Sequence, residues 1–125
     1  MSDDVLMVRK NALETRLGVP LEFSSGWISL VERLVDAIDA LDIPYEVDQV
    51  KEKFGGLRFY WHQPYPEGEI PDDERADRRE ASTKIRALID AAEAESIQTC
   101  EICGAPGRPQ GKGWIRTLCD DHATG

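Results

Sequence analysis

The chain is poor in the residues from which most catalytic sites are built, with three cysteines and two histidines among its 125 residues. His62 is followed by Gln63 and Pro64, so the His-x-Glu motif of zinc deaminases is absent. No histidine lies between Cys103 and Cys119, where some treble-clef nucleases carry catalytic histidines. We therefore expect a protein that is not an enzyme, and a nuclease or another hydrolase is the least favoured hypothesis.

Long apolar runs are missing as well. No apolar stretch reaches the length that spans a bilayer, which excludes a transmembrane helix. The first residues, Met1-Ser-Asp-Asp4, are acidic where a signal peptide would be basic, and no apolar region follows them. The expected location is the cytoplasm of the cell that makes the protein.

Basic residues are the minority, since 15 lysines and arginines face 24 aspartates and glutamates and give a net charge of −9. A protein that binds a nucleic-acid backbone gains affinity by neutralising phosphates, so this charge opposes general DNA or RNA binding. It suits a protein that binds a soluble partner, because a net charge far from zero limits self-association.

Three segments have the period of an amphipathic helix. Residues 3–17 follow a possible Ser2 or Asp3 cap and stop at Gly18. Residues 25–41 follow a possible Ser24 or Ser25 cap, and residues 72–96 begin with two aspartates that can cap them. The apolar stripes of the three helices contain Leu6, Leu13 and Leu17; Trp27, Leu30, Val31, Leu34, Val35, Ile38 and Leu41; and Ala81, Ile85, Leu88, Ile89 and Ala92.

Residues 45–62 predict a β-hairpin because apolar and polar residues alternate on both sides of Gly55-Gly56. The two glycines supply the positive φ angles of a tight connection. On the first strand Tyr45, Val47 and Gln49 alternate with Glu46, Asp48 and Val50; on the second, Leu57, Phe59 and Trp61 form the core face. The fold class is therefore α+β, with two or three helices packed on a small antiparallel hairpin.

Near the end of the chain four metal-ligating residues stand in the pattern Cys100-x2-Cys103-x15-Cys119-x2-His122. Thiolate and imidazole are zinc ligands, and four of them complete a tetrahedron, so we predict one structural Zn²⁺. A catalytic zinc would keep a position open for water. The alternative is that these are unrelated buried cysteines with a surface histidine, and the paired spacing argues against it.

The surroundings of these ligands indicate a treble-clef or zinc-ribbon finger. Gly104 fits a tight knuckle, residues 108–118 can fold as a short hairpin around Gly111 and Gly113, and Cys119 with His122 would share one face of a first helical turn. The predicted organisation is an α+β body over residues 1–99 and a zinc finger over residues 100–125.

One candidate binding surface lies on the hairpin, where basic and aromatic residues gather in an otherwise acidic chain: Lys51, Lys53, Arg58, Tyr60 and His62. Tyr60 could stack on a planar ligand while the cations meet negative charge. The alternative is an ordinary strand whose aromatics are packing residues and whose arginine pairs with a carboxylate. A second candidate surface, for weak nucleic-acid binding, is the predicted zinc hairpin with Arg108, Lys112, Trp114 and Arg116.

With both features in view, the chain resembles a group of small uncharacterised phage and prophage proteins. The resemblance rests on Gly26-Trp27, on Gln49-Val-Lys-Glu-Lys-Phe-Gly-Gly-Leu-Arg-Phe-Tyr60, and on Cys100-Glu-Ile-Cys-Gly-Ala-Pro-Gly107 with Trp114 and Thr117-Leu-Cys119. It implies a phage origin and a bacterial host, and it implies no activity.

The leading hypothesis is a non-enzymatic accessory protein that binds a host or phage factor, for example to inhibit a host defence system. One alternative is capture of a small anionic ligand such as a nucleotide by Lys51, Lys53, Arg58 and Tyr60. The other alternative is nucleic-acid binding by the zinc hairpin. A homodimer is compatible with the sequence, although no specific feature of the sequence supports it.

Overall fold

A computed structural model describes residues 3–123. The elements are α1 (Asp3–Leu17), β1 (Leu21–Glu22), the 3₁₀ turn η1 (Ser25–Trp27), α2 (Ile28–Ala40), β2 (Glu46–Lys53), β3 (Gly56–His62), α3 (Asp72–Ser96), β4 (Arg108–Gln110) and β5 (Arg116–Leu118). The predicted α+β class and its three helices are confirmed within this part of the chain. None of the described helices is long and apolar enough to cross a membrane.

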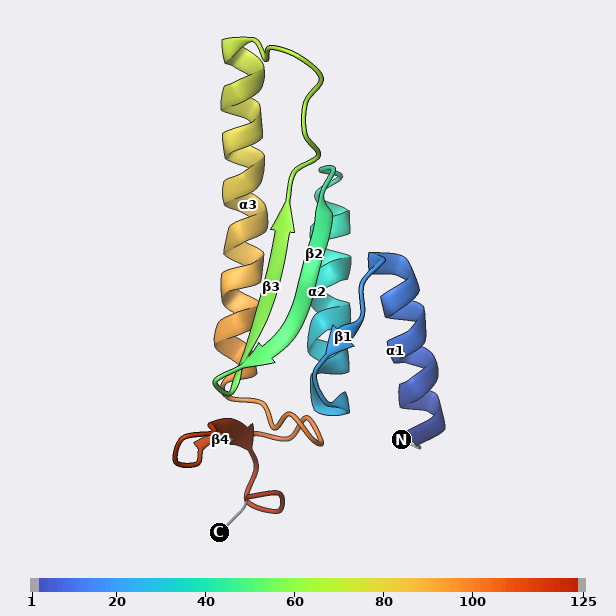
Figure 1. The fold of residues 1–125 in the computed structure, drawn as a ribbon, viewed down its shortest axis with the longest axis vertical. Helices are drawn as coiled ribbons and strands as arrows, with labels where there is room; N and C mark the ends of the chain where they lie inside the picture. Colours follow the sequence, from blue (N-terminus) through green and yellow to red (C-terminus); the bar gives the residue numbers. More distant parts are fainter. Residues whose placement is uncertain (1–2, 124–125) are drawn as a thin grey trace.

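The helices enclose one face and one edge of a three-stranded sheet (Figure 1). Helix α2 lies behind β2 and β3, α3 runs alongside β3, and α1 flanks α2 on the side of β1. The apolar stripes predicted for the three helices all contribute to the core, whose centre is formed by Trp27, Val31, Val35, Ile38, Val50, Leu57 and Ile85, each fully buried.

The sheet contains one strand more than the sequence pattern predicts. Strand β1 pairs in parallel with β2, with Leu21 opposite Val50, and β2 pairs antiparallel with β3. A strand of two residues is too short to show a period, so only its pairing reveals it. On the far edge, β3 is protected by α3, because the N–H groups of Leu57 and Phe59 donate to Ser96 Oγ (2.9 Å) and Glu93 Oε2 (3.0 Å).

The alternation predicted for the first strand of the hairpin is wrong in its second half. The register shifts between Val47 and Gln49, so Asp48 is the extra residue of a β-bulge. Val47 and Val50 therefore both contribute to the core, whereas strict alternation places them on opposite faces. The predicted core face of the second strand is confirmed for Leu57 and Phe59, which are buried, and Trp61 is partly buried against the same core.

The connection between β2 and β3 is a two-residue turn, but its residues are Phe54 and Gly55 rather than the predicted Gly55-Gly56. Phe54 has φ 54° and Gly55 has φ 83°, the pair of left-handed conformations that a type I′ turn requires. Gly56 is already the first residue of β3, opposite Lys53. A Cβ at Gly56 would lie 3.3 Å from Ile97 Cγ2, a closer contact than most side chains make.

The helix starts also differ from the predictions. Ser24 precedes the 3₁₀ turn η1 and makes no side-chain capping bond, so α2 begins at Ile28 rather than residue 25. Helix α3 is preceded by Pro71, also without a side-chain cap. Instead, the negative charges of Asp72, Asp73 and Glu74 in its first turn stabilise α3 by their interaction with the positive end of the helix dipole. Ser2 lies outside the described residues, and Asp3 is the first residue of α1.

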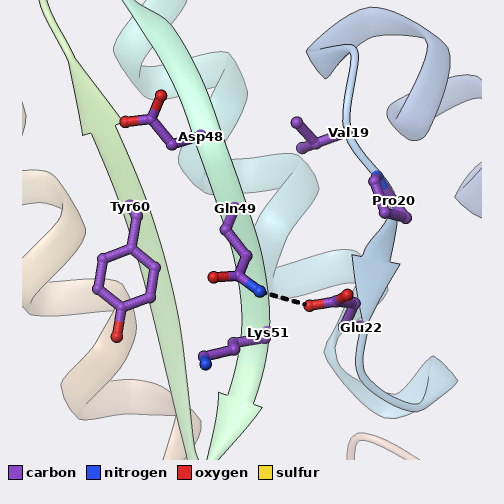
Figure 2. A pocket seen from close by; sticks show the side chains of 7 residues that line it. All are labelled: Val19, Pro20, Glu22, Asp48, Gln49, Lys51 and Tyr60. Carbon is purple, nitrogen blue, oxygen red and sulfur yellow. Dashed lines mark hydrogen bonds between the residues drawn. The ribbon is translucent and has the colours of Figure 1, made fainter.

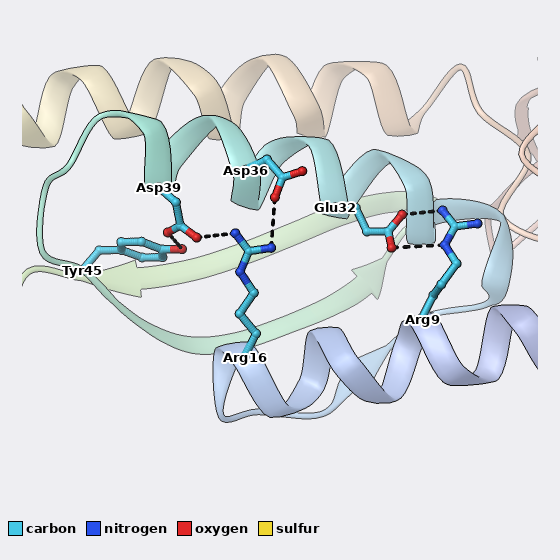
Figure 3. A network of polar contacts seen from close by, with 6 residues as sticks. All are labelled: Arg9, Arg16, Glu32, Asp36, Asp39 and Tyr45. Atoms are coloured by element: carbon cyan, nitrogen blue, oxygen red, sulfur yellow. Dashed lines mark hydrogen bonds and ion pairs between the residues drawn. The ribbon is translucent and has the colours of Figure 1, made fainter.

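Ion pairs join α1 to α2 beside the apolar contacts of Leu13 (Figure 3). Arg9 pairs with Glu32, while Arg16 reaches Asp36 Oδ1 at 2.9 Å and also pairs with Asp39. The Tyr45 hydroxyl donates to Asp39 Oδ1 at 2.8 Å, and burial together with that carboxylate raises the pKa of Tyr45. These pairs lie on the turns of α2 that face α1, and they link the two helices along their length.

His62, one of the candidate binding residues, lies between two carboxylates. Its Nε2 is 2.7 Å from Glu46 Oε2 and its Nδ1 is 2.8 Å from Asp48 Oδ1. The ring also stacks on Tyr65 at 4.9 Å. The hydrogen bond with Asp48, and then the one with Glu46, raise the pKa of His62 above 6.5 despite some desolvation.

The first prediction concerns this cluster. Because the folded pKa of His62 is raised, the ion pairs stabilise the fold fully below the unfolded pKa of about 6.5 and are lost as the pH rises through the folded pKa. Asp48→Asn should therefore move the NMR titration midpoint of the His62 ring back toward 6.5, while Asp42→Asn, at an exposed turn, should leave it unchanged. An unaltered midpoint in Asp48→Asn would contradict the assignment.

Candidate metal centre

Cys100, Cys103, Cys119 and His122 lie together at the C-terminal end of the fold, with all four ligand atoms within 4.8 Å of one another. Cys103 Sγ is 3.6 Å from Cys119 Sγ, and His122 Nδ1 is 3.2 Å from Cys119 Sγ and 3.7 Å from Cys100 Sγ. The three sulfurs are free thiols, and their separations are far beyond the ~2.05 Å of a disulfide. The group can hold a metal ion.

Local backbone geometry positions the first pair of ligands. The N–H of Gly104 donates to the carbonyl of Cys100 at 2.8 Å, and the N–H of Cys100 donates to the carbonyl of Ala105 at 2.7 Å. Gly104 has φ 81°, a left-handed conformation that favours glycine. The chain therefore turns tightly around Cys103 and points both sulfurs to one side, which confirms the role predicted for Gly104.

The second pair of ligands follows strand β5. Strands β4 and β5 form the predicted hairpin, with Arg108 opposite Leu118. Beyond it, the N–H of His122 donates to the carbonyl of Cys119 at 3.2 Å. In the part of the chain that the structure describes, this is a single turn rather than the first turn of a helix. The turn still brings both side chains to the same side.

The backbone around Cys100 favours a thiolate. Burial opposes a charge on this sulfur, but hydrogen bonds from the backbone at Cys119, Cys103 and Ile102 outweigh it and lower the pKa of Cys100 to about 6. At Cys103 the backbone of Ala105 favours the thiolate, while burial and the neighbouring thiols raise the pKa. The backbone therefore favours ionisation of the first ligand, and a bound cation would favour the thiolate form of all three cysteines.

The backbone around Cys100, which forms the knuckle of the first ligand pair, is in direct contact with η1 at the start of the main core helix. The N–H of Gly26 donates to the carbonyl of Glu101 at 2.7 Å, and the Trp27 indole N–H donates to the carbonyl of Thr99 at 2.9 Å. A Cβ at Gly26 would lie 2.2 Å from the Cys100 carbonyl oxygen. The buried Trp27 ring and the metal centre are therefore held by the same short piece of backbone.

Glu101, which sequence reasoning missed, is the buried carboxylate of this contact. Its Oε2 accepts the N–H of Ser24, the residue before η1, at 2.9 Å. Its Oε1 lacks a hydrogen bond and lies 3.5 Å from Arg116 Nη2. A charged residue between two predicted cysteine ligands looks solvent-exposed in a sequence, and only the approach of η1 and β5 buries it.

The tip of the β2–β3 hairpin contacts the metal module from the other side. The Thr117 hydroxyl donates to the carbonyl of Gly55 at 2.5 Å, and Thr117 is fully buried. A Cβ at Gly55 would lie 3.1 Å from Ile115 Cγ2. The stretch around Gly55 therefore meets the strand that leads into Cys119, although more than fifty residues separate them in the sequence.

The candidate hairpin residues are only partly brought together. Lys51 and Tyr60 line a hollow of about 480 Å³ on the open face of the sheet, with Lys51 Nζ 6.0 Å from the Tyr60 ring centre (Figure 2). Glu22 and Asp48 line the same hollow. Arg58 folds back onto the carbonyl of Leu57 at 3.2 Å. Lys53 lies at the turn, and His62 is held by its two carboxylates.

Of the candidate residues of the zinc hairpin, the two arginines lie near carboxylates of the chain, and the other two residues lie in an exposed loop. Arg108 lies 3.5 Å from Asp120 Oδ1, and Arg116 is drawn toward Glu101. Lys112 and Trp114 lie in the exposed loop between β4 and β5, where Trp114 is 76% exposed. Two of the four predicted contacts thus already face carboxylates within the chain.

Comparisons with models of protein families, with curated proteins and with solved structures found no significant match to this chain.

The second prediction tests the contact between the knuckle and the core helix. Gly26→Ala should lower the free energy of unfolding by about 2–4 kcal/mol, because the added methyl group overlaps backbone that cannot move without displacing Cys100. Gly113→Ala is the matched control, since its site is open and only its φ of 83° opposes a side chain; it should cost about 1 kcal/mol. Equal losses in urea-unfolding measurements would show that the close approach is absent.

Proposed function

We propose that this protein is a non-enzymatic binding protein of phage origin, which uses one structural zinc ion to hold a partner-binding surface in place. The observation that carries the proposal is the convergence of the two hairpins at the metal module. The β2–β3 turn and the β4–β5 hairpin, which carry the two predicted binding surfaces, meet through Gly55, Ile115 and Thr117. We call residues 51–58 and 108–118 the hairpin end.

The donor set supports zinc at the metal centre. With Zn–S bonds of about 2.3 Å and Zn–N bonds of about 2.0 Å, a tetrahedral site has sulfur–sulfur edges of about 3.8 Å and sulfur–nitrogen edges of about 3.5 Å. The separations of 3.6 Å, 3.2 Å and 3.7 Å among the ligands fit these edges. Four protein ligands leave no position for a substrate, which supports a structural ion. The β4–β5 hairpin between the ligand pairs supports a finger of the treble-clef or zinc-ribbon kind.

The hairpin end differs in charge from the rest of the molecule. It contains six basic residues and one acidic residue in a chain of net charge −9, namely Lys51, Lys53, Arg58, Arg108, Lys112 and Arg116 against Glu52. Phe54 is 66% exposed and Trp114 is 76% exposed. Each precedes a residue of the Gly55–Ile115 contact, so both aromatic side chains belong to one end of the molecule. Exposed aromatics among cations are the composition of a protein-binding hot spot.

A protein partner with an acidic surface fits this end best. An anionic small ligand in the Lys51–Tyr60 hollow would also meet Glu22 and Asp48. A nucleic-acid backbone would depend on the cations, and Arg108 and Arg116 already face carboxylates. A protein partner would also gain from burying the two exposed aromatics. The resemblance to phage proteins supports a host or phage factor as the partner and the bacterial cytoplasm as the place of action. Inhibition of a host defence system is one specific form of such binding.

The third prediction concerns the metal. Native mass spectrometry of the purified protein should show one zinc per chain, and Cys119→Ser should lower the zinc affinity by orders of magnitude because a neutral hydroxyl replaces a thiolate ligand. A chelator should also speed hydrogen exchange of the Gly26 amide, since its acceptor is the carbonyl of Glu101. A chain that retains no zinc, or a Gly26 amide that is indifferent to the chelator, would contradict the structural role.

The fourth prediction concerns the binding surface. The tagged protein should capture a defined set of proteins from bacterial extract, and Phe54→Ala with Trp114→Ala should reduce that set at least about tenfold, because buried aromatic anchors contribute most of the affinity of an interface. Tyr65→Ala is the matched control: Tyr65 is 82% exposed but lies outside the hairpin end. Capture that survives the double substitution would place the surface elsewhere. A bound nucleotide detected by mass spectrometry would favour ligand capture instead.

A further inference from the structure

A groove of about 460 Å³ lies at the opposite end of the long axis from the hairpin end, where the loop after β3 meets the first turns of α3 (Figure 1). Pro64, Tyr65 and Ile70 supply apolar surface to it. Tyr65 is held in place by its stacking on His62. The groove is therefore an open hollow whose floor includes apolar side chains.

The rim of this groove is acidic. Five carboxylates line it, from Asp42, Glu67, Glu69, Glu74 and Asp77. Arg78 is the one cation among the lining residues, and it has a structural role: its guanidinium donates to the carbonyl of Pro64 at 3.0 Å, and its own carbonyl accepts from Gln63 Nε2 at 3.0 Å. We call this feature the acidic groove. Its charge calls for a basic occupant that also carries an apolar side chain.

The same chain presents a segment of that chemistry at its other end. The exposed Phe54 has the Lys53 ammonium 5.5 Å from its ring centre, and Trp114 stands in a loop with Lys112. Each of these pairs offers an aromatic ring to enter an apolar hollow and a cation to meet its rim. Because the groove and the hairpin end lie at opposite ends of one molecule (Figure 1), they cannot meet within a single copy.

We propose that the hairpin end of one copy docks into the acidic groove of a second copy. This proposal takes the hairpin end of the proposed function as its binding element and adds the groove as its receptor. The interface is heterologous, so each copy that donates its hairpin end keeps its own groove free, and further copies can add head to tail. The net charge of −9 opposes close approach, but at physiological salt repulsion beyond about 8 Å is screened while the contact pairs are not. The association is therefore weak and depends on concentration.

Sedimentation velocity of the zinc-loaded protein over roughly a hundredfold range of concentration tests the proposal. The wild-type mass should rise above the 14.0 kDa of one chain. Two variants should stay at one chain, with a dissociation constant raised at least about tenfold: Lys53→Glu with Lys112→Glu at the hairpin end, and Glu74→Lys with Asp77→Lys in the groove. Asp4→Lys with Asp90→Lys, which makes the same change of net charge as the groove variant but at positions outside both surfaces, should associate like the wild type.

Mixing the two variants gives a sharper result. The hairpin-end variant keeps an intact groove and the groove variant keeps an intact hairpin end, so an equimolar mixture should form a dimer that does not grow further. A wild type that remains a monomer overturns the proposal, and so does association that persists in the groove variant. Neither result touches the proposed function, because the groove variant retains the hairpin end and should still capture the partner proteins that the wild type captures.

Discussion

The backbone contact between Gly26 and Glu101 is the constraint on which the rest of the structure depends. A hydrogen bond of 2.7 Å joins the two peptides, and there is no space for a side chain between them. On one side of this contact the chain continues into Trp27 and the helix that forms the core. On the other side it continues into Cys100 and Cys103. The main apolar core and the metal centre therefore share a boundary made of backbone, where the tolerance for displacement is smallest.

This shared boundary explains the arrangement of a small protein with two separate buried clusters. The cluster around Cys100, Leu118 and Cys119 is too small to be stable by apolar burial alone. In our proposal, zinc binding supplies the missing free energy of folding. It also stabilises the start of α2, because Gly26 and Trp27 are hydrogen-bonded to the backbone of the knuckle. The buried Glu101 adds a polar link, because its carboxylate accepts the N–H of Ser24 and faces Arg116. Loss of the metal would thus disturb α2, the helix that contributes six of the fifteen buried residues of the main core.

The distinctive stretch around Phe54-Gly55-Gly56 has a structural explanation as well as a proposed role in binding. Gly55 meets Thr117 and Ile115, Gly56 leaves room for Ile97, and Leu57 and Phe59 are core residues. What these contacts leave exposed is Lys53 and Phe54 at the turn. The backbone of the turn is anchored at its tip, because the Gly55 carbonyl accepts a hydrogen bond from Thr117 of β5. A turn whose backbone is already ordered loses less entropy on binding, which is the physical basis of the surface that we propose.

The sequence by itself determined the three helices, the two-stranded hairpin and the four ligand residues. Each is a local pattern: a period of 3.6 residues, a period of 2, or two ligand pairs with two residues between their members. Only the tertiary structure decided the bulge at Asp48, the strand at Leu21-Glu22 and the burial of Glu101. It also decided that Gly55 meets Thr117, which unites two surfaces that the sequence places far apart. The physical reason is that backbone hydrogen bonds between distant segments do not depend on side-chain type. The local pattern of residues therefore cannot predict them.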